Sequence, residues 1–241
     1  HSLLLERIYT TNFIFITSCV LLEPAASGAY RSIYSQDRLF LMSKLPSELP
    51  PEIVRISWLL GLWEGVGQGQ YPNSSNFSFI QQLEFNNDGR SFIDYESKSW
   101  ELNADGSAGQ PLHSEKGFWK PGEGASVEVS ISHVTGISEI WTGLNEVLTI
   151  EEAKITSARA RIATQWVGRV PSAKPVDAGD RLYGLMNGEL MWTYDMAAVG
   201  QEMQNHLWAR LKPLSESQII ETKKTGKPVN KHVVPSIPGV K

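Results

Sequence analysis

The sequence of 241 residues contains a single cysteine, Cys19. One cysteine cannot form an intramolecular disulfide, and it excludes a metal cluster held by cysteine thiolates. A single cysteine is compatible with a reducing compartment, so we predict a cytoplasmic location. The sequence also lacks a large excess of charge of either sign, since the formal net charge is −4. This balance gives no reason to expect a nucleic acid as partner.

Several signatures of catalysis are missing. The sequence has no G-x-S-x-G motif and no H-x-x-x-H pair, so a serine-hydrolase elbow and a zinc site held by protein ligands alone are disfavoured. The glycine-rich stretch after residue 60 is not followed by Lys-Ser or Lys-Thr, which argues against a phosphate-binding loop. Carboxylates are plentiful, but the sequence does not show which of them pair. A hydrolase therefore has no support.

Long hydrophobic runs are also absent. The apolar segment 12–22 is shorter than the roughly 20 residues of a membrane span, so we predict none. With Arg7 before it and small residues after it, this segment faintly resembles a secretory signal. Met42 begins a stretch that reads like a natural start, and residues 43–51 hold three prolines. We therefore interpret residues 1–54 as an upstream extension and a proline-rich linker, and favour this over a signal.

Glycine, in contrast, is concentrated in the stretch L-G-L-W-E-G-V-G-Q-G-Q-Y-P (60–72). Four glycines and Trp63 occupy alternate positions from 61 to 69, so in a strand they share one face. Glycine in a strand indicates a sharp bend or a close approach by a backbone or ligand. Two interpretations remain open: the glycines curve a closing sheet, or they make room for a ligand.

The rest of the chain alternates between short apolar strands and turns. About ten strands follow one another every eight to twelve residues, a spacing typical of an antiparallel barrel or sandwich. We predict an all-β fold with one antiparallel barrel over residues 55–213. The tail 214–241 has five lysines and two glutamates from Ser215 onward, and we predict a basic segment without regular structure that is disordered or draped on the surface. The strands expected after the glycine-rich stretch are 77–85, 91–102, 111–120, 125–133, 137–143, 146–150, 158–167, 182–186, 189–194 and 205–211.

Three histidines fall inside the predicted domain: His113, His133 and His206. A lone histidine in a strand is more often a surface or core residue than a ligand. One imidazole among apolar and aromatic residues nevertheless suits a haem, which needs a single axial histidine. The assignment of His206 as a ligand conflicts with the alternation of side chains along a strand. If Leu207 points into the barrel, His206 points outward, unless the strand starts after His206.

Four motifs in the same order resemble the nitrobindin family: G-L-W-E-G-V-G-Q-G-Q-Y-P (61–72), P-L-H-S-E-K-G-F-W (111–119), P-S-A-K (171–174) and M-A-A-V-G-Q-E-M-Q-N-H-L-W-A-R-L (196–211). With the strands between them, the resemblance covers roughly residues 55–213. It implies a barrel of about ten antiparallel strands, similar in outline to fatty-acid-binding proteins and lipocalins. The sequence departs from many members at Asn73-Ser74 after Tyr71-Pro72 and at Gln81-Gln82.

The resemblance also implies a function and a site. Members bind one haem b noncovalently, mainly as ferric haem, bind nitric oxide and isomerise peroxynitrite to nitrate. His206 matches the iron ligand, and His113 matches a histidine across the haem pocket in some members; we assign both to catalysis. Lys174 lies in a motif near the haem edge, where it could pair with a propionate. The predicted haem-binding residues are His206, His113, Lys174, Trp63 as part of the pocket floor, and Asn73.

Two other functions remain as alternatives. The barrel could carry a small apolar, fatty-acid-like molecule without haem, and an inward Arg or Tyr that clamps a carboxylate would favour this. An interaction module that uses the basic tail would require a solidly packed barrel. A homodimer is left open.

Overall fold

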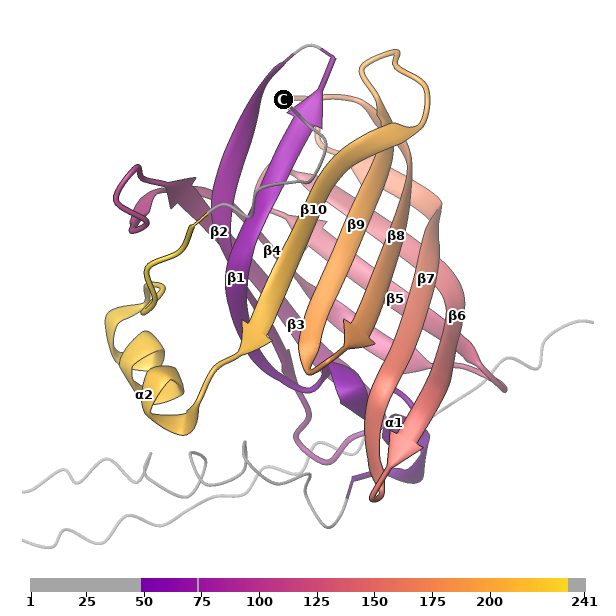
Figure 1. Cartoon of the computed structure of the whole chain (residues 1–241). Coiled ribbons are helices and arrows are strands. Elements are labelled where there is room, and N and C mark those ends of the chain that lie inside the picture. Colours follow the sequence, from indigo (N-terminus) through magenta and orange to yellow (C-terminus); the bar gives the residue numbers. More distant parts are fainter. Residues whose placement is uncertain (1–48, 73, 234–241) are drawn as a thin grey trace, which may run out of the picture. The chain divides into compact units, whose positions relative to one another are not determined.

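The computed structural model describes residues 49–72 and 74–233, in which ten antiparallel strands close into one barrel. The strand order is β1-β10-β9-β8-β7-β6-β5-β4-β3-β2, so every strand pairs with its neighbour in sequence and β1 pairs with β10 (Figure 1). The predicted fold class is thereby confirmed. The strands are β1 (Gly61–Tyr71), β2 (Ser74–Asn86), β3 (Ile93–Leu102), β4 (Ala108–Pro121), β5 (Ser126–His133), β6 (Ile137–Glu151), β7 (Lys154–Arg169), β8 (Val176–Met186), β9 (Glu189–Ala198) and β10 (Gln204–Pro213).

Side chains of alternate strand positions fill the barrel interior. Large aromatic residues of this core include Trp119, Trp141 and Tyr183, which are fully buried. Two short helical segments, α1 (Pro51–Val54) and η2 (Ser57–Leu59), lie at the end where β1 begins (Figure 1). Trp58 of η2 belongs to the core, and its indole nitrogen donates a hydrogen bond to Asn145 Oδ1 at 2.8 Å.

Several strand ends differ from the prediction, most of all that of β8, which begins at Val176 rather than at 182. Two larger features of the secondary structure also differ. The strands expected at 137–143 and 146–150 form one continuous strand, β6, paired with β7 along most of its length. The tail was predicted to lack regular structure, but Glu216–Thr225 forms a helix, α2. Ser215 and Gln218 make a capping box at its start, and Gly226 ends it with a left-handed conformation. The other terminal segments assigned from the sequence, 1–48 and 234–241, lie outside the described residues.

The segment after α2, residues 226–232, is held on the outside of the barrel by Glu64 of β1. The carboxylate of Glu64 accepts hydrogen bonds from the backbone of Val229 (3.1 Å) and Asn230 (3.0 Å) and from His232 Nε2 (3.0 Å). Gln82 Nε2 donates to the same carboxylate at 2.7 Å. Burial alone raises the pKa of Glu64, but these hydrogen bonds outweigh it and hold the pKa below its ordinary value.

Glu64→Gln is expected to lower the free energy of unfolding by about 1–3 kcal/mol. Each carboxylate oxygen accepts at least two hydrogen bonds, so the amide NH2 of glutamine would face donors in either orientation. Hydrogen exchange should show faster exchange of the amides of residues 226–232. Glu84→Gln is the matched control, because Glu84 makes an exposed ion pair with Lys223 and should change stability by less than about 1 kcal/mol. Equal effects of the two variants would contradict the anchoring role of Glu64.

Candidate functional site

A cavity of about 820 Å³ occupies the end of the barrel at which β1 ends. This volume lies within the range of about 300–1,000 Å³ that is usual for small-molecule and cofactor sites. Three of the residues predicted from the sequence line it: His206, His113 and Lys174. Its apolar and aromatic lining comes from Tyr71, Phe77, Phe79, Leu112, Ile137, Trp192, Tyr194, Met196 and Leu207.

A β-bulge turns His206 toward this cavity. In the pairing of β10 with β9, Asn205 lies opposite Asp195 and Leu207 lies opposite the next residue, Tyr194, so His206 is the extra residue. A bulge interrupts alternation and re-aims a side chain. His206 and Leu207 therefore both line the cavity, although they are neighbours in sequence. The outward orientation that strict alternation implied for His206 does not occur.

The ring of His206 is fixed by one hydrogen bond and two aromatic contacts. Nδ1 lies 3.0 Å from the carbonyl oxygen of Gln70, and because a carbonyl only accepts, Nδ1 carries the proton. Nε2 then keeps its lone pair. The rings of Tyr71 and Tyr194 lie 5.2 Å and 5.9 Å from the imidazole, centroid to centroid. Burial lowers the pKa of His206 despite the hydrogen bond to Gln70, which favours the neutral ring that a metal ion needs.

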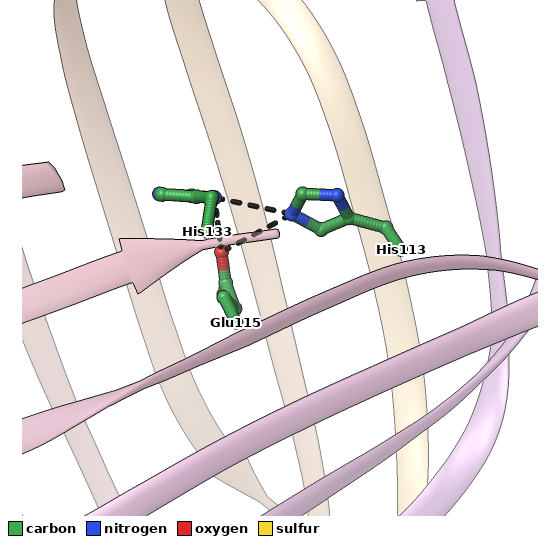
Figure 2. Close-up of side chains that lie close together, drawn as sticks. All are labelled: His113, Glu115 and His133. Atoms are coloured by element: carbon green, nitrogen blue, oxygen red, sulfur yellow. Dashed lines mark hydrogen bonds and ion pairs between the residues drawn. The ribbon is translucent and has the colours of Figure 1, made fainter. Parts of the chain in front are cut away.

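A second group of polar side chains lines the same cavity: His113, Glu115 and His133 (Figure 2). His133 Nδ1 lies 3.1 Å from His113 Nε2 and 3.1 Å from Glu115 Oε2. The other ring nitrogen of His133, Nε2, lies 2.8 Å from Glu139 Oε2. Burial lowers the pKa of His113, so this ring is neutral near pH 7.

Arg181 of β8 reaches across the barrel to Glu115 of β4. Its Nη1 and Nη2 lie 2.7 Å and 3.0 Å from Glu115 Oε1 and Oε2, a bidentate pair, and Tyr95 donates its hydroxyl to the same carboxylate. Both members of the pair are buried. Burial would raise the pKa of Glu115, but the adjacent guanidinium outweighs it and holds the pKa far below its usual range. The guanidinium also lies over the rings of Tyr194 and Trp141, at 4.6 Å and 5.1 Å.

The structure does not bring Trp63 to this group. Trp63 donates its indole N–H to the Leu59 carbonyl at 2.8 Å and lines a separate cavity of about 800 Å³ at the opposite end of the barrel. Of the described residues that line this second cavity, none is a histidine. Asn73 lies outside the described residues.

The glycine-rich strand contacts neighbouring residues of the barrel. A Cβ atom at Gly67 would come within 2.3 Å of the Phe79 ring, and one at Gly69 within 2.2 Å of the Phe77 ring. These glycines therefore accommodate the two phenylalanine rings, and the rings rather than the bare backbone line the cavity. Of the two interpretations of this stretch, the packing of a curved sheet accounts for the positions of Gly67 and Gly69.

His133, Glu139 and Arg181 belong to the site, although the sequence analysis did not assign them. For His133 a signal existed: the hairpin between β4 and β5 places it directly opposite Glu115. Residues facing each other across an antiparallel pair interact, so the turn 121–124 indirectly specifies this contact. Arg181 joins Glu115 over 66 positions of sequence. No local pattern indicates such a long-range pair.

Comparison with known proteins agrees with this geometry. Residues 52–212 match the family model described as the THAP4-like, heme-binding beta-barrel domain. The chain belongs to this family. A peroxynitrite isomerase of Nocardioides sp. is 38% identical over 168 residues, covering 70% of this chain and 96% of the relative. A ferric nitrobindin-like protein of Cutibacterium acnes is 34% identical over 171 residues, covering 70% and 97%.

A solved structure of the same fold is that of Rv2717c from M. tuberculosis. It is 32% identical, with a TM-score of 0.64, and the match covers 69% of this chain and 99% of that chain. The nitrobindin resemblance of the sequence is thereby confirmed, and the barrel is a haem-binding domain by family. No helix in residues 49–72 and 74–233 is long and apolar enough to cross a membrane.

Proposed function

We propose that this protein binds one ferric haem b in the cavity lined by His206, binds nitric oxide there and isomerises peroxynitrite to nitrate. The observation that carries the proposal is the position of His206, which lines a large apolar cavity with Nδ1 protonated and Nε2 carrying a lone pair. The names of the relatives support the same function.

The residues present fit a haem. Its flat, apolar ring needs a cavity with apolar walls, and aromatic side chains form much of this lining. The hydrogen bond from Nδ1 to Gln70 fixes the tautomer and the ring orientation of His206, as outer hydrogen bonds commonly do for metal-binding histidines. We assign Nε2 of His206 to the iron. Lys174, exposed at the rim in the loop between β7 and β8, would pair with a propionate.

When bound, ferric haem supplies a Lewis-acid iron with one coordination position left for a small anion. The chain orients that anion. His113 lines the cavity and its Nε2 is directed at His133, so Nδ1 is the ring nitrogen available to donate a hydrogen bond to the substrate. The apolar walls limit the access of water and strengthen that hydrogen bond. We therefore propose His206 as iron ligand and His113 as the residue that contacts the substrate.

Arg181 argues against the apolar-carrier alternative. A carrier of fatty acids would use an inward arginine to bind the carboxylate of its cargo. The guanidinium of Arg181 is inside the barrel, but both of its terminal nitrogens already bind Glu115. The interaction-module alternative required a solid barrel, and the 820 Å³ cavity contradicts it.

A haem titration of the full-length chain tests the proposal. We expect wild type to develop a saturable Soret band near one equivalent of ferric haem, and His206→Ala to lose or shift it. Gln204→Ala is the matched control, because Gln204 begins β10 but does not line the cavity. The loaded wild type should then speed the conversion of peroxynitrite to nitrate, measured by stopped-flow absorbance. Identical spectra of wild type and His206→Ala would exclude His206 as ligand, and no band at all would favour the apolar carrier.

A further inference from the structure

The group formed by His113, Glu115 and His133 has the composition and the spacing of a metal site. Its three candidate ligand atoms come from two adjacent strands, β4 and β5, that face each other in register (Figure 2). Two imidazoles and one carboxylate are a donor set typical of zinc and of other divalent transition metals, and unlike the all-oxygen sets of calcium and magnesium.

The distances between these atoms fit one ion. His133 Nδ1 lies 3.1 Å from His113 Nε2 and 3.1 Å from Glu115 Oε2, and the last two atoms are 3.9 Å apart. A circle through three points with these separations has a radius of about 2.0 Å. Zinc–nitrogen and zinc–oxygen bonds measure about 2.0–2.2 Å. An ion slightly above this centre would therefore be within bonding distance of all three atoms, and the fourth position of a distorted tetrahedron would be left open.

The surrounding groups complete the arrangement. Glu139 Oε2 lies 2.8 Å from Nε2 of His133, so Nε2 can donate its proton there and leave the lone pair of Nδ1 for the ion. Carboxylate–histidine–metal chains of this kind are usual around bound metals. Arg181 and Tyr95 fix the orientation of the Glu115 carboxylate. With both imidazoles neutral, the state in which they bind a metal, Glu115, Glu139 and Arg181 together carry a charge of −1, which favours a cation.

The missing H-x-x-x-H pair disfavoured a zinc site, but the pairing of β4 with β5 brings the ligands together without that spacing. We propose that His113 Nε2, His133 Nδ1 and Glu115 Oε2 bind a divalent transition-metal ion of the zinc class. All three residues line the cavity, so a further coordination position would be open to a small ligand there. This site is separate from His206 and uses neither its ring nor a haem. The barrel would then have two metal centres. The only residue common to both is His113, which would bind zinc through Nε2 and contact the substrate of the haem site through Nδ1.

Isothermal titration of chelator-treated, full-length protein with Zn²⁺ tests the proposal. We expect one ion per chain in wild type, binding about 100-fold or more weaker in His113→Gln, and binding about 10–100-fold weaker in Glu139→Gln, which alters only the partner of His133. His206→Ala is the matched control, since it removes an imidazole from the same cavity but outside the cluster. It should bind Zn²⁺ as wild type does.

Two results would overturn the proposal. One is a wild type that takes up no zinc, and the other is His113→Gln that binds it as tightly as wild type. X-ray absorption spectroscopy of the wild-type protein with one equivalent of Zn²⁺ tests the ligands directly and needs no variant. Backscattering from two imidazole rings is expected, and a first shell without imidazole would contradict the assignment. Because neither measurement involves haem, the proposal can fail while the haem titration succeeds, and the reverse.

Discussion

Glu115→Ala is expected to lower the free energy of unfolding by about 3–5 kcal/mol, the usual effect of removing one partner of a buried ion pair. Only 2% of the Arg181 side chain is exposed, and Glu115 binds both of its terminal nitrogens. Without the carboxylate, the guanidinium would remain inside the barrel without the partner that binds its terminal nitrogens, and the hydroxyl of Tyr95 would lose its acceptor. Urea denaturation of chelator-treated protein, followed by tryptophan fluorescence, measures this change.

Two further variants serve as controls for Glu115→Ala. Glu128→Ala removes a carboxylate whose ion pair with Lys120 is exposed, so a change below about 1 kcal/mol is expected. The double variant Glu115→Leu with Arg181→Met removes both charges and should recover much of the stability lost in Glu115→Ala. If Glu115→Ala is no less stable than Glu128→Ala, the buried pair does not have the role we assign to it.

Gly65→Ala is expected to destabilise the barrel by about 3 kcal/mol or more, at the upper end of overpacking effects. A Cβ atom at Gly65 would come within 2.1 Å of the carbonyl oxygen of Arg210 and 2.8 Å of the Leu211 Cα. Both are backbone atoms of β10, so no side-chain rotation can relieve the contact. The paired strands β1 and β10 would have to separate locally. Thermal unfolding and chemical denaturation both measure the effect.

Gly184→Ala is the matched control for Gly65→Ala. Gly184 also lies in a strand, β8, but the nearest atom to an added Cβ is 3.9 Å away. Alanine restricts the unfolded chain more than glycine does, so a change between zero and a gain of about 1 kcal/mol is expected. A similar loss in both variants would show that the glycines act through chain flexibility rather than through the close approach of β1 to β10.

The barrel could be predicted from the sequence because its signals are local. Alternating apolar residues and turns such as Asn187-Gly188 specify strands one by one, and ten strands without long helices leave few architectures. The helix α2 also had a local signal, the capping box of Ser215 and Gln218 with Gly226 at the other end. The composition of the tail outweighed this signal in our prediction. Packing against the outer face of the barrel stabilises the segment, and composition does not report such packing.

The site was only partly predictable for a different reason. Alternation alone would have turned His206 outward, and the bulge that turns it inward depends on how β10 and β9 pair. Residue types next to His206 do not specify that register. The link between Arg181 and Glu115 likewise depends on two strands on opposite sides of the barrel. The family resemblance predicted His206 and His113 as site residues, whereas the buried charges around them depend on contacts between strands far apart in sequence.

The pairing of β1 with β10 also constrains how the chain folds. These strands are in register from Trp63–Pro213 to Gly69–Leu207, so residues that meet there are 138 to 150 positions apart. Contacts of such long sequence separation form late and slow the folding reaction. During synthesis, the sheet has two unpaired edges until the last strand has left the ribosome. Unpaired edges can form hydrogen bonds with other chains and so promote aggregation. A chain that stops before residue 204 would keep those edges permanently, and aggregation would be its expected fate.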